Sequence, residues 1–281
     1  MSLNDTSIEK KLNIAIENQK NKNFKLAEKL YKEILTINPD HTEAIFHLGT
    51  LYSQIKKFSL AKPLLLRADG SNPNNLNIKL NIGSLLFNTG EVDLALKYFD
   101  KAIEIQPNFI LAYFNKGIIL NSQKKYQDAV KCFEKVIEID PKNINAYNVL
   151  GIILQEIGEF RKSLSYLKKS IEISPNDLRV VNTLLNLLRS IKLSNLSDKN
   201  SSELVELFIF LFNKDTIDHN ELFNNARNLI FFQDDQINFE NLLKSGVSLL
   251  SDKDIKKILN KKLFHLLLQK SLVRDKFLEK F

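Results

Sequence analysis

Apolar positions recur along residues 8–177 with a spacing that predicts paired helices. They lie three and four residues apart, which places their side chains on one face of an α-helix. Short polar turns, such as "NTGE" at 88–91 and "EIGE" at 156–159, separate one helical run from the next. Each second run ends at a proline, which lacks a backbone donor and restricts the residue before it. The pattern therefore predicts five consecutive pairs of helices.

The pairs repeat with a fixed period. The stretch "IEIQPN" at 103–108 has near-copies at 137–142 and 171–176, each the last turn of a packing helix followed by its stop. Five of the six prolines lie 34 residues apart: Pro39, Pro73, Pro107, Pro141 and Pro175. They divide the chain into units 8–41, 42–75, 76–109, 110–143 and 144–177. A constant period of this length is typical of a solenoid.

Equivalent positions in the units agree in size. The first helix of each unit carries a small residue: Ala15, Gly49, Gly83, Gly117 and Gly151. The second helix carries another: Ala27, Ala61, Ala95, Ala129 and Ser163. A bulky residue follows four positions later: Tyr31, Leu65, Phe99, Phe133 and Leu167. Small residues allow two helices to lie close together, so we expect the four glycines at helix contacts. Gly90 and Gly158 can supply the positive φ that a helix exit prefers.

The second unit departs most from the pattern. Pro63 falls inside its second helix, and we expect it in the first turn, where a missing N–H is tolerated. The sequence "RADGSNPN" replaces the usual acidic and apolar helix end. Gly70 in this stretch is expected to shorten the helix.

Residues 178–281 lose the 34-residue register but keep helical spacing, for example in "SELVELFIFLFN" and "NFENLLKSGVSLL". Helix-like sequence at 177–188 could begin a sixth unit. Ser202 and Asp252 are predicted N-caps. We expect these helices to cover the end of the solenoid. The sequence stops at Phe281 within an amphipathic pattern, which favours a chain truncated at its C-terminus.

The 34-residue period, the small and bulky packing positions and the late proline resemble the tetratricopeptide repeat family over residues 8–177. The resemblance implies an all-α fold, a right-handed superhelical solenoid of antiparallel helix pairs followed by a C-terminal helical region. It also implies a concave groove lined by the first helices. In O-linked N-acetylglucosamine transferase and its bacterial relatives, an asparagine just before the Leu-Gly pair bonds the backbone of an extended peptide.

The predicted peptide-binding groove follows from that resemblance. The asparagine position is occupied here by Asn13, His47, Asn81, Asn115 and Val149, and the position before it by Leu12, Phe46, Leu80, Phe114 and Asn148. An amide both donates and accepts hydrogen bonds, which suits any peptide backbone. The predicted site is Asn13, Phe46, His47, Leu80, Asn81, Phe87, Phe114, Asn115 and Asn148. A purely structural role for the apolar row remains open. Family members that clamp a terminal carboxylate use basic residues where Leu12 and Ile16 stand here, so we do not expect that clamp.

Composition and charge narrow the alternatives. Lys and Arg outnumber Asp and Glu by 40 to 33, but the excess is spread along the chain without a basic stripe, which argues against a nucleic-acid partner. Cys132, the only cysteine, rules out an intramolecular disulfide and is interpreted as a half-buried structural thiol. The polar N-terminal sequence and the short apolar runs favour a cytoplasmic protein without a membrane span. The four histidines, His41, His47, His219 and His265, show no metal-ligand spacing, so no metal or cofactor is expected.

Two functions stay open from the sequence. The first is a protein-interaction module or scaffold that binds an extended protein segment. The alternative is the substrate-recognition part of a larger methyltransferase or glycosyltransferase whose catalytic domain lies beyond residue 281. These residues themselves contain no phosphate-binding loop, nucleophile elbow or convergent acid–base pair, so we expect no catalysis from them.

Overall fold

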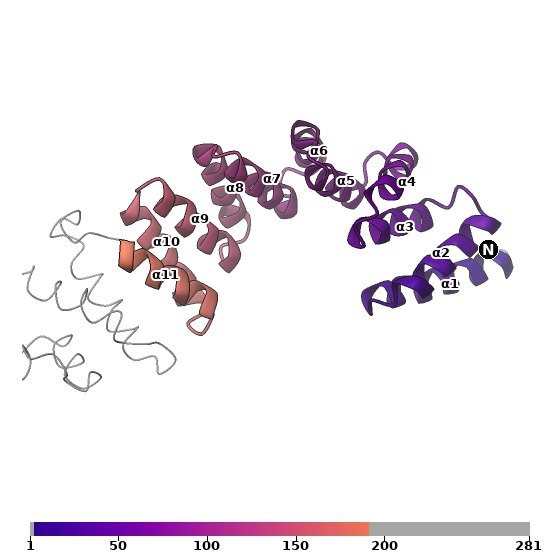
Figure 1. Ribbon diagram of the computed structural model, residues 1–281, viewed down its shortest axis with the longest axis horizontal. Helices are drawn as coiled ribbons and strands as arrows, with labels where there is room; N and C mark the ends of the chain where they lie inside the picture. Colours follow the sequence, from indigo (N-terminus) through magenta and orange to yellow (C-terminus); the bar gives the residue numbers. More distant parts are fainter. Residues whose placement is uncertain (1–2, 191–281) are drawn as a thin grey trace, which may run out of the picture. The chain divides into compact units, whose positions relative to one another are not determined.

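A computed structural model describes residues 3–190, which form eleven α-helices and no strand (Figure 1). The helices are α1 (Leu3–Lys20), α2 (Phe24–Ile37), α3 (Thr42–Gln54), α4 (Phe58–Ser71), α5 (Leu76–Asn88), α6 (Val92–Ile105), α7 (Ile110–Ser122), α8 (Tyr126–Ile139), α9 (Ile144–Glu156), α10 (Phe160–Ile173) and α11 (Leu178–Ser190). They confirm the predicted all-α solenoid of helix pairs. None of the described helices is long and apolar enough to cross a membrane.

The chain divides into two compact units, residues 1–146 and 147–281, called here the N-terminal and C-terminal units. The N-terminal unit holds α1 to α8. Within it each odd-numbered helix packs on the next even-numbered one, and α1, α3, α5 and α7 also pack on one another in sequence. The described part of the C-terminal unit contains most of α9 together with α10 and α11, and α10 packs on α11.

The predicted glycine contacts are confirmed. A Cβ atom on Gly83 would lie 2.7 Å from the ring of Phe99, and one on Gly117 would lie 2.8 Å from the ring of Phe133. In the C-terminal unit, a Cβ on Gly151 would lie 2.5 Å from Leu167. Contacts this short leave no room for a side chain. The bulky residue of each second helix therefore fills the space that the glycine of the first helix leaves open.

The turns inside the helix pairs share one backbone conformation. Gly90 (φ 85°) and Gly158 (φ 79°) have the positive φ predicted for them. Lys22, Lys56 and Lys124 stand at the equivalent positions of the other pairs, with φ values of 62°, 60° and 59°. The turn therefore has the same backbone geometry whether glycine or lysine stands at this position. The lysines adopt it even though a side chain makes the left-handed region unfavourable.

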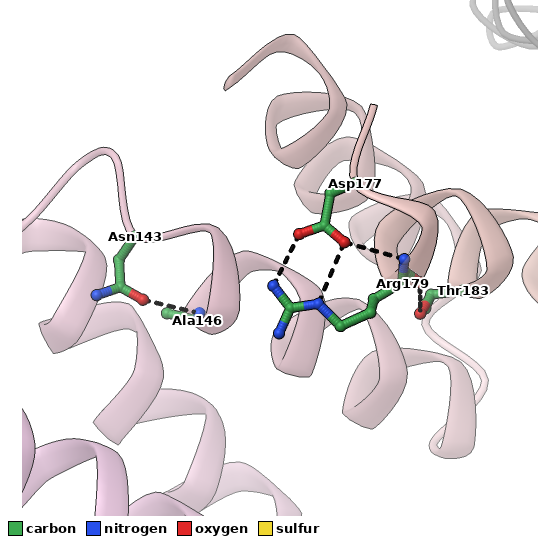
Figure 2. A network of polar contacts seen from close by, with 5 residues as sticks. All are labelled: Asn143, Ala146, Asp177, Arg179 and Thr183. Carbon is green, nitrogen blue, oxygen red and sulfur yellow. Dashed lines mark hydrogen bonds and ion pairs between the residues drawn. The ribbon is translucent and has the colours of Figure 1, made fainter. Parts of the chain in front are cut away.

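Side chains cap most of the first helices. Asn75 Oδ1 accepts hydrogen bonds from the N–H groups of Asn77 (3.0 Å) and Ile78 (3.2 Å), and His41 Nδ1 accepts one from the N–H of Ala44. Asn143 Oδ1 accepts one from the N–H of Ala146 (Figure 2). These bonds satisfy donors that the start of a helix leaves unpaired, and they fix where each first helix begins.

In the C-terminal unit, Asp177 begins α11 in the same way. Its Oδ1 accepts a hydrogen bond from the N–H of Arg179, and its carboxylate forms an ion pair with the Arg179 guanidinium at 2.7 Å (Figure 2). The hydrogen bond from the Arg179 guanidinium lowers the pKa of Asp177. Asp177 also lies 34 residues after Asn143, so α11 begins where the first helix of a sixth pair would begin.

Three expectations about single residues were wrong. Pro63 is the sixth residue of α4, not part of its first turn, and the helix continues through it. Gly70 does not shorten α4, which has 14 residues like α6 and α8. Packing of the apolar face of α4 outweighs the low helix propensity of both residues. Cys132 is buried, not half-buried. The helices predicted beyond residue 190, their caps Ser202 and Asp252, and His219 and His265 lie outside the described residues.

Candidate functional site

The first and second helices of the central pairs differ sharply in charge. The first helices α3, α5 and α7 have 13 residues each and contain one charged residue each: Glu43, Lys79 and Lys116. At the chain's overall 26% charged residues, about three per helix would be expected. The second helices α6 and α8 contain five charged residues each, and α4 contains three. The surface formed by the first helices is therefore almost neutral.

Both lysines of this surface are bound to carboxylates of the preceding second helix. Lys79 Nζ lies 2.5 Å from Asp69 Oδ1, and its side chain is only 6% exposed. Lys116 Nζ lies 2.6 Å from Asp100 Oδ1. Each ion pair joins one helix pair to the next. The Lys79–Asp69 pair is buried, whereas the Lys116–Asp100 pair is partly exposed, and in both the lysine charge is compensated by its carboxylate.

A cavity of about 220 Å³ lies between α5 and α7. It is lined by Ser84, Phe87, Asn88, Phe99, Asn115, Ile118 and Ile119. The structure thus brings together Phe87 and Asn115, two of the predicted groove residues. The rest of the lining consists of apolar side chains, one hydroxyl and one further amide. Such a lining suits an apolar group flanked by a peptide backbone.

Sequence reasoning missed Ser84, Asn88 and Ile118, although their spacing could have revealed them. Ser84 and Asn88 lie three and seven residues after Asn81, and Ile118 lies three after Asn115. These intervals keep them on the helical face that carries the two asparagines. Apart from Phe87, the prediction considered only the asparagine position and the one before it.

The same cavity recurs in the C-terminal unit. A space of about 450 Å³ is lined by Ile152, Gln155, Glu156, Phe160, Thr183 and Asn186. Five of these residues lie 68 positions, or two repeats, after Ser84, Phe87, Asn88, Asn115 and Ile118. Here α9 and α11 take the places of α5 and α7. A cavity between successive first helices is thus a property of the repeat, whereas its chemistry differs, because Glu156 stands where Asn88 does.

His47 lies on α3 among aromatic rings. It stacks on Tyr31, with ring centroids 6.0 Å apart, and its ring lies 5.1 Å from that of the neighbouring Phe46. Burial lowers the pKa of His47, although Glu43 opposes the shift. The imidazole is therefore neutral at pH 7 and can both donate and accept a hydrogen bond, as an asparagine amide can.

The remaining predicted residues differ in their surroundings. Asn81 Nδ2 donates to the carbonyl of Asn77 on its own helix. Phe114 packs edge-on against Phe133, with centroids 5.2 Å apart, which ties it to the core of its own pair. Asn13 is exposed, whereas Leu80 is partly buried against the core. In the C-terminal unit, Asn148 Oδ1 is buried and finds no hydrogen-bond partner among the described residues.

The described residues show no cluster of three or more His, Cys, Asp or Glu side chains that could hold a metal ion. Cys132 packs beside Gly117 in the fourth pair. Burial raises the pKa of its thiol, which disfavours the reactive thiolate.

Three family models match the repeats. All three are described as the tetratricopeptide repeat, and they match residues 42–75, residues 77–109 with 110–143, and residues 132–164. The matches follow the 34-residue register of the helix pairs. Residues 42–164 are tetratricopeptide repeats. A comparison with curated proteins finds no match.

Solved structures show the same repeat architecture as this tetratricopeptide repeat protein. MamA is 24% identical with a TM-score of 0.53, covering 59% of this chain and 97% of its own. YrrB, described as a tetratricopeptide repeat protein with an unusual peptide-binding site, is 22% identical with a TM-score of 0.52, covering 64% and 97%. PilF of Pseudomonas aeruginosa is 16% identical with a TM-score of 0.59, covering 74% and 96%. At these identities the likeness concerns the fold alone.

Proposed function

We propose that this protein is an interaction module that binds an extended segment of a partner protein along its first helices. The observation that carries the proposal is the cavity between α5 and α7, where Phe87 and Asn115 meet. An amide beside an apolar cavity can bond a peptide backbone while the cavity receives a side chain. The structurally similar YrrB, described as having a peptide-binding site, supports this use of the fold.

The asparagines would act as backbone ligands. Asn81 already uses its Nδ2 in a bond to Asn77, so its Oδ1 would accept from a peptide N–H. Asn115 at the cavity edge would bond the same strand one repeat further along. Spacing by repeats suits an extended chain, because its backbone groups recur regularly and do not depend on side-chain identity. His47, neutral at pH 7, would serve the same purpose on α3.

Binding measurements with an isolated partner segment test whether the groove asparagines contribute to affinity. After a partner is captured from a cell extract and its binding segment is defined, the Asn81→Ala/Asn115→Ala variant should bind that segment with lower affinity. Each lost bond is expected to cost about 0.5–1.5 kcal/mol, or roughly fivefold to a hundredfold together. Asn74→Ala and Asn108→Ala, at exposed turn positions, are the matched control. Equal affinity of both double variants for the segment would refute a role for the two groove asparagines.

The repeats would bind a partner protein and would not catalyse a reaction themselves. Their first helices offer amides, hydroxyls and apolar side chains, which bind peptides well but are poor acids, bases or nucleophiles. The buried Cys132 has a raised pKa, and His47 contacts the rings of Tyr31 and Phe46 and has no carboxylate hydrogen-bonded to it among the described residues to act with it as an acid–base pair. We therefore assign the described repeats a binding function without catalysis.

A further inference from the structure

The first helices α5 and α7 contain one charged residue each, whereas the second helices α6 and α8 contain five each. On α5 and α7 the residues that line the cavity are Ser84, Phe87, Asn88, Asn115, Ile118 and Ile119, none of which is charged. The one lysine of each helix is paired with a carboxylate of the helix before it. A ligand on this surface therefore meets no opposite charge that could offset the cost of desolvating its own.

We infer that the groove over α5 and α7 selects an extended, uncharged peptide segment that places one aliphatic side chain in the cavity. This inference rests on the proposed function and adds the chemistry of the ligand. A volume of about 220 Å³ exceeds that of several water molecules, so the cavity can take a branched aliphatic group. Phe87, Phe99 and Ile118 line it on sides contributed by α5, α6 and α7. An acidic or basic side chain would lose hydration there without meeting an opposite charge among the lining residues.

The C-terminal unit supplies an internal comparison. Its cavity between α9 and α11 has Gln155 and Glu156 where Phe87 and Asn88 stand, and Thr183 and Asn186 where Asn115 and Ile118 stand. The cavity at the equivalent repeat position is therefore more polar and acidic in the C-terminal unit, and largely apolar and neutral in the N-terminal unit. A ligand side chain suited to the α5–α7 cavity does not suit its counterpart. The selectivity is accordingly assigned to the residues that differ, of which Asn88 is the simplest to change.

A library of random peptides of about twelve residues, displayed on phage and selected on the full chain, is the probe. Enriched peptides should be poor in Asp, Glu, Lys and Arg and should share one Leu, Ile or Val at a fixed place. Replacing that residue by Asp in a synthetic, end-capped peptide should weaken binding at least about tenfold by fluorescence polarisation. Affinity should change little between low and high salt, because no ion pair contributes.

Two variants locate the selectivity. Asn88→Glu, which copies the residue of the C-terminal cavity, should weaken binding of the aliphatic peptide about fivefold or more, whereas Asn108→Glu, at an exposed turn position, should leave it unchanged. Ser84→Leu should weaken it similarly by filling the cavity without adding charge. Thermal melting checks that each variant is folded.

The outcomes distinguish failure of the inferred ligand chemistry from failure of peptide binding itself. Enrichment of charged peptides, or equal loss in Asn88→Glu and Asn108→Glu, would overturn the inferred ligand chemistry while leaving peptide binding intact. Selection of no peptide at all would overturn the proposed function itself.

Discussion

At the scale of single residues, the close contacts of the glycines control whether a helix pair can form. Gly117→Leu should lower the free energy of unfolding by about 1–3 kcal/mol, because even a Cβ there would lie 2.8 Å from Phe133. Gly70→Ala is the control, since nothing lies within 4 Å of the added methyl group. It should stabilise α4 by about 0.5–1 kcal/mol. Urea unfolding measures both, and a near-normal stability of Gly117→Leu would contradict the packing described here.

His47 should make stability depend on pH. Burial places its folded-state pKa below the ordinary value of 6.5, so the unfolded chain binds more protons than the folded one in this range. Its contribution is therefore fully present above pH about 6.5 and is lost as pH falls through the lower folded-state value.

The His47→Asn variant removes this titration. Urea unfolding at pH about 7.5 and 5.5 should show a smaller loss of stability on acidification in the variant than in the original chain. The comparison uses the difference between the two pH values, because the variant also loses ring contacts with Tyr31 and Phe46 at every pH. An equal loss in both proteins would mean that His47 titrates normally.

At the scale of elements, the ion pair between α4 and α5 joins two helix pairs. Lys79 is buried and bonded to Asp69, with its ammonium also 5.7 Å from the ring of Tyr98. Asp69→Asn would leave a buried ammonium without its counter-charge and should cost about 3 kcal/mol or more. Lys79→Met leaves the Asp69 carboxylate without its counter-charge, but Asp69 is 16% exposed against 6% for Lys79 and is more easily hydrated, so this variant should cost less.

Thermal or urea unfolding of the two variants checks this order. Lys135→Met is a suitable control, because its ion pair with Glu138 lies on the surface of α8 and contributes little. If Lys79→Met were as destabilising as Asp69→Asn, an unpaired carboxylate at position 69 would be as costly as an unpaired ammonium at position 79, which would contradict the expected order.

The helices were largely predictable from the sequence because their signals are local. Features imposed by packing between helices were not predictable in this way. Apolar spacing and the 34-residue prolines specify helix starts and ends because they act locally. The turns at Lys22, Lys56 and Lys124 were predicted, but their positive φ was missed because lysine does not prefer it and the fold imposes it. Packing in α4 likewise overrides Pro63 and Gly70. The cavity was found only in part, because it needs two helices and the prediction treated one position at a time.

At the scale of the whole molecule, a destabilising change in one repeat is expected to affect mainly the adjacent repeats. In the N-terminal unit each helix packs mainly on the helices next to it in the chain, and first helices also on the next first helix. Stability in such an array is approximately a sum of local terms and interfaces between adjacent repeats. A globular core would instead spread a defect over the entire unit.

Hydrogen exchange tests this property. In the Asp69→Asn variant, amides of α4 and α5 should lose most protection, and those of α3 and α6, which pack directly on them, should lose less. Amides of α1 and α8 should exchange at nearly their original rates, because neither helix packs closely on α4 or α5. Gly70→Ala, which changes α4 without touching the ion pair, should leave the exchange rates of α5 unchanged. A uniform loss of protection from α1 to α8 would show that the unit unfolds as one cooperative body, and the groove over α5 and α7 would then depend on every repeat at once.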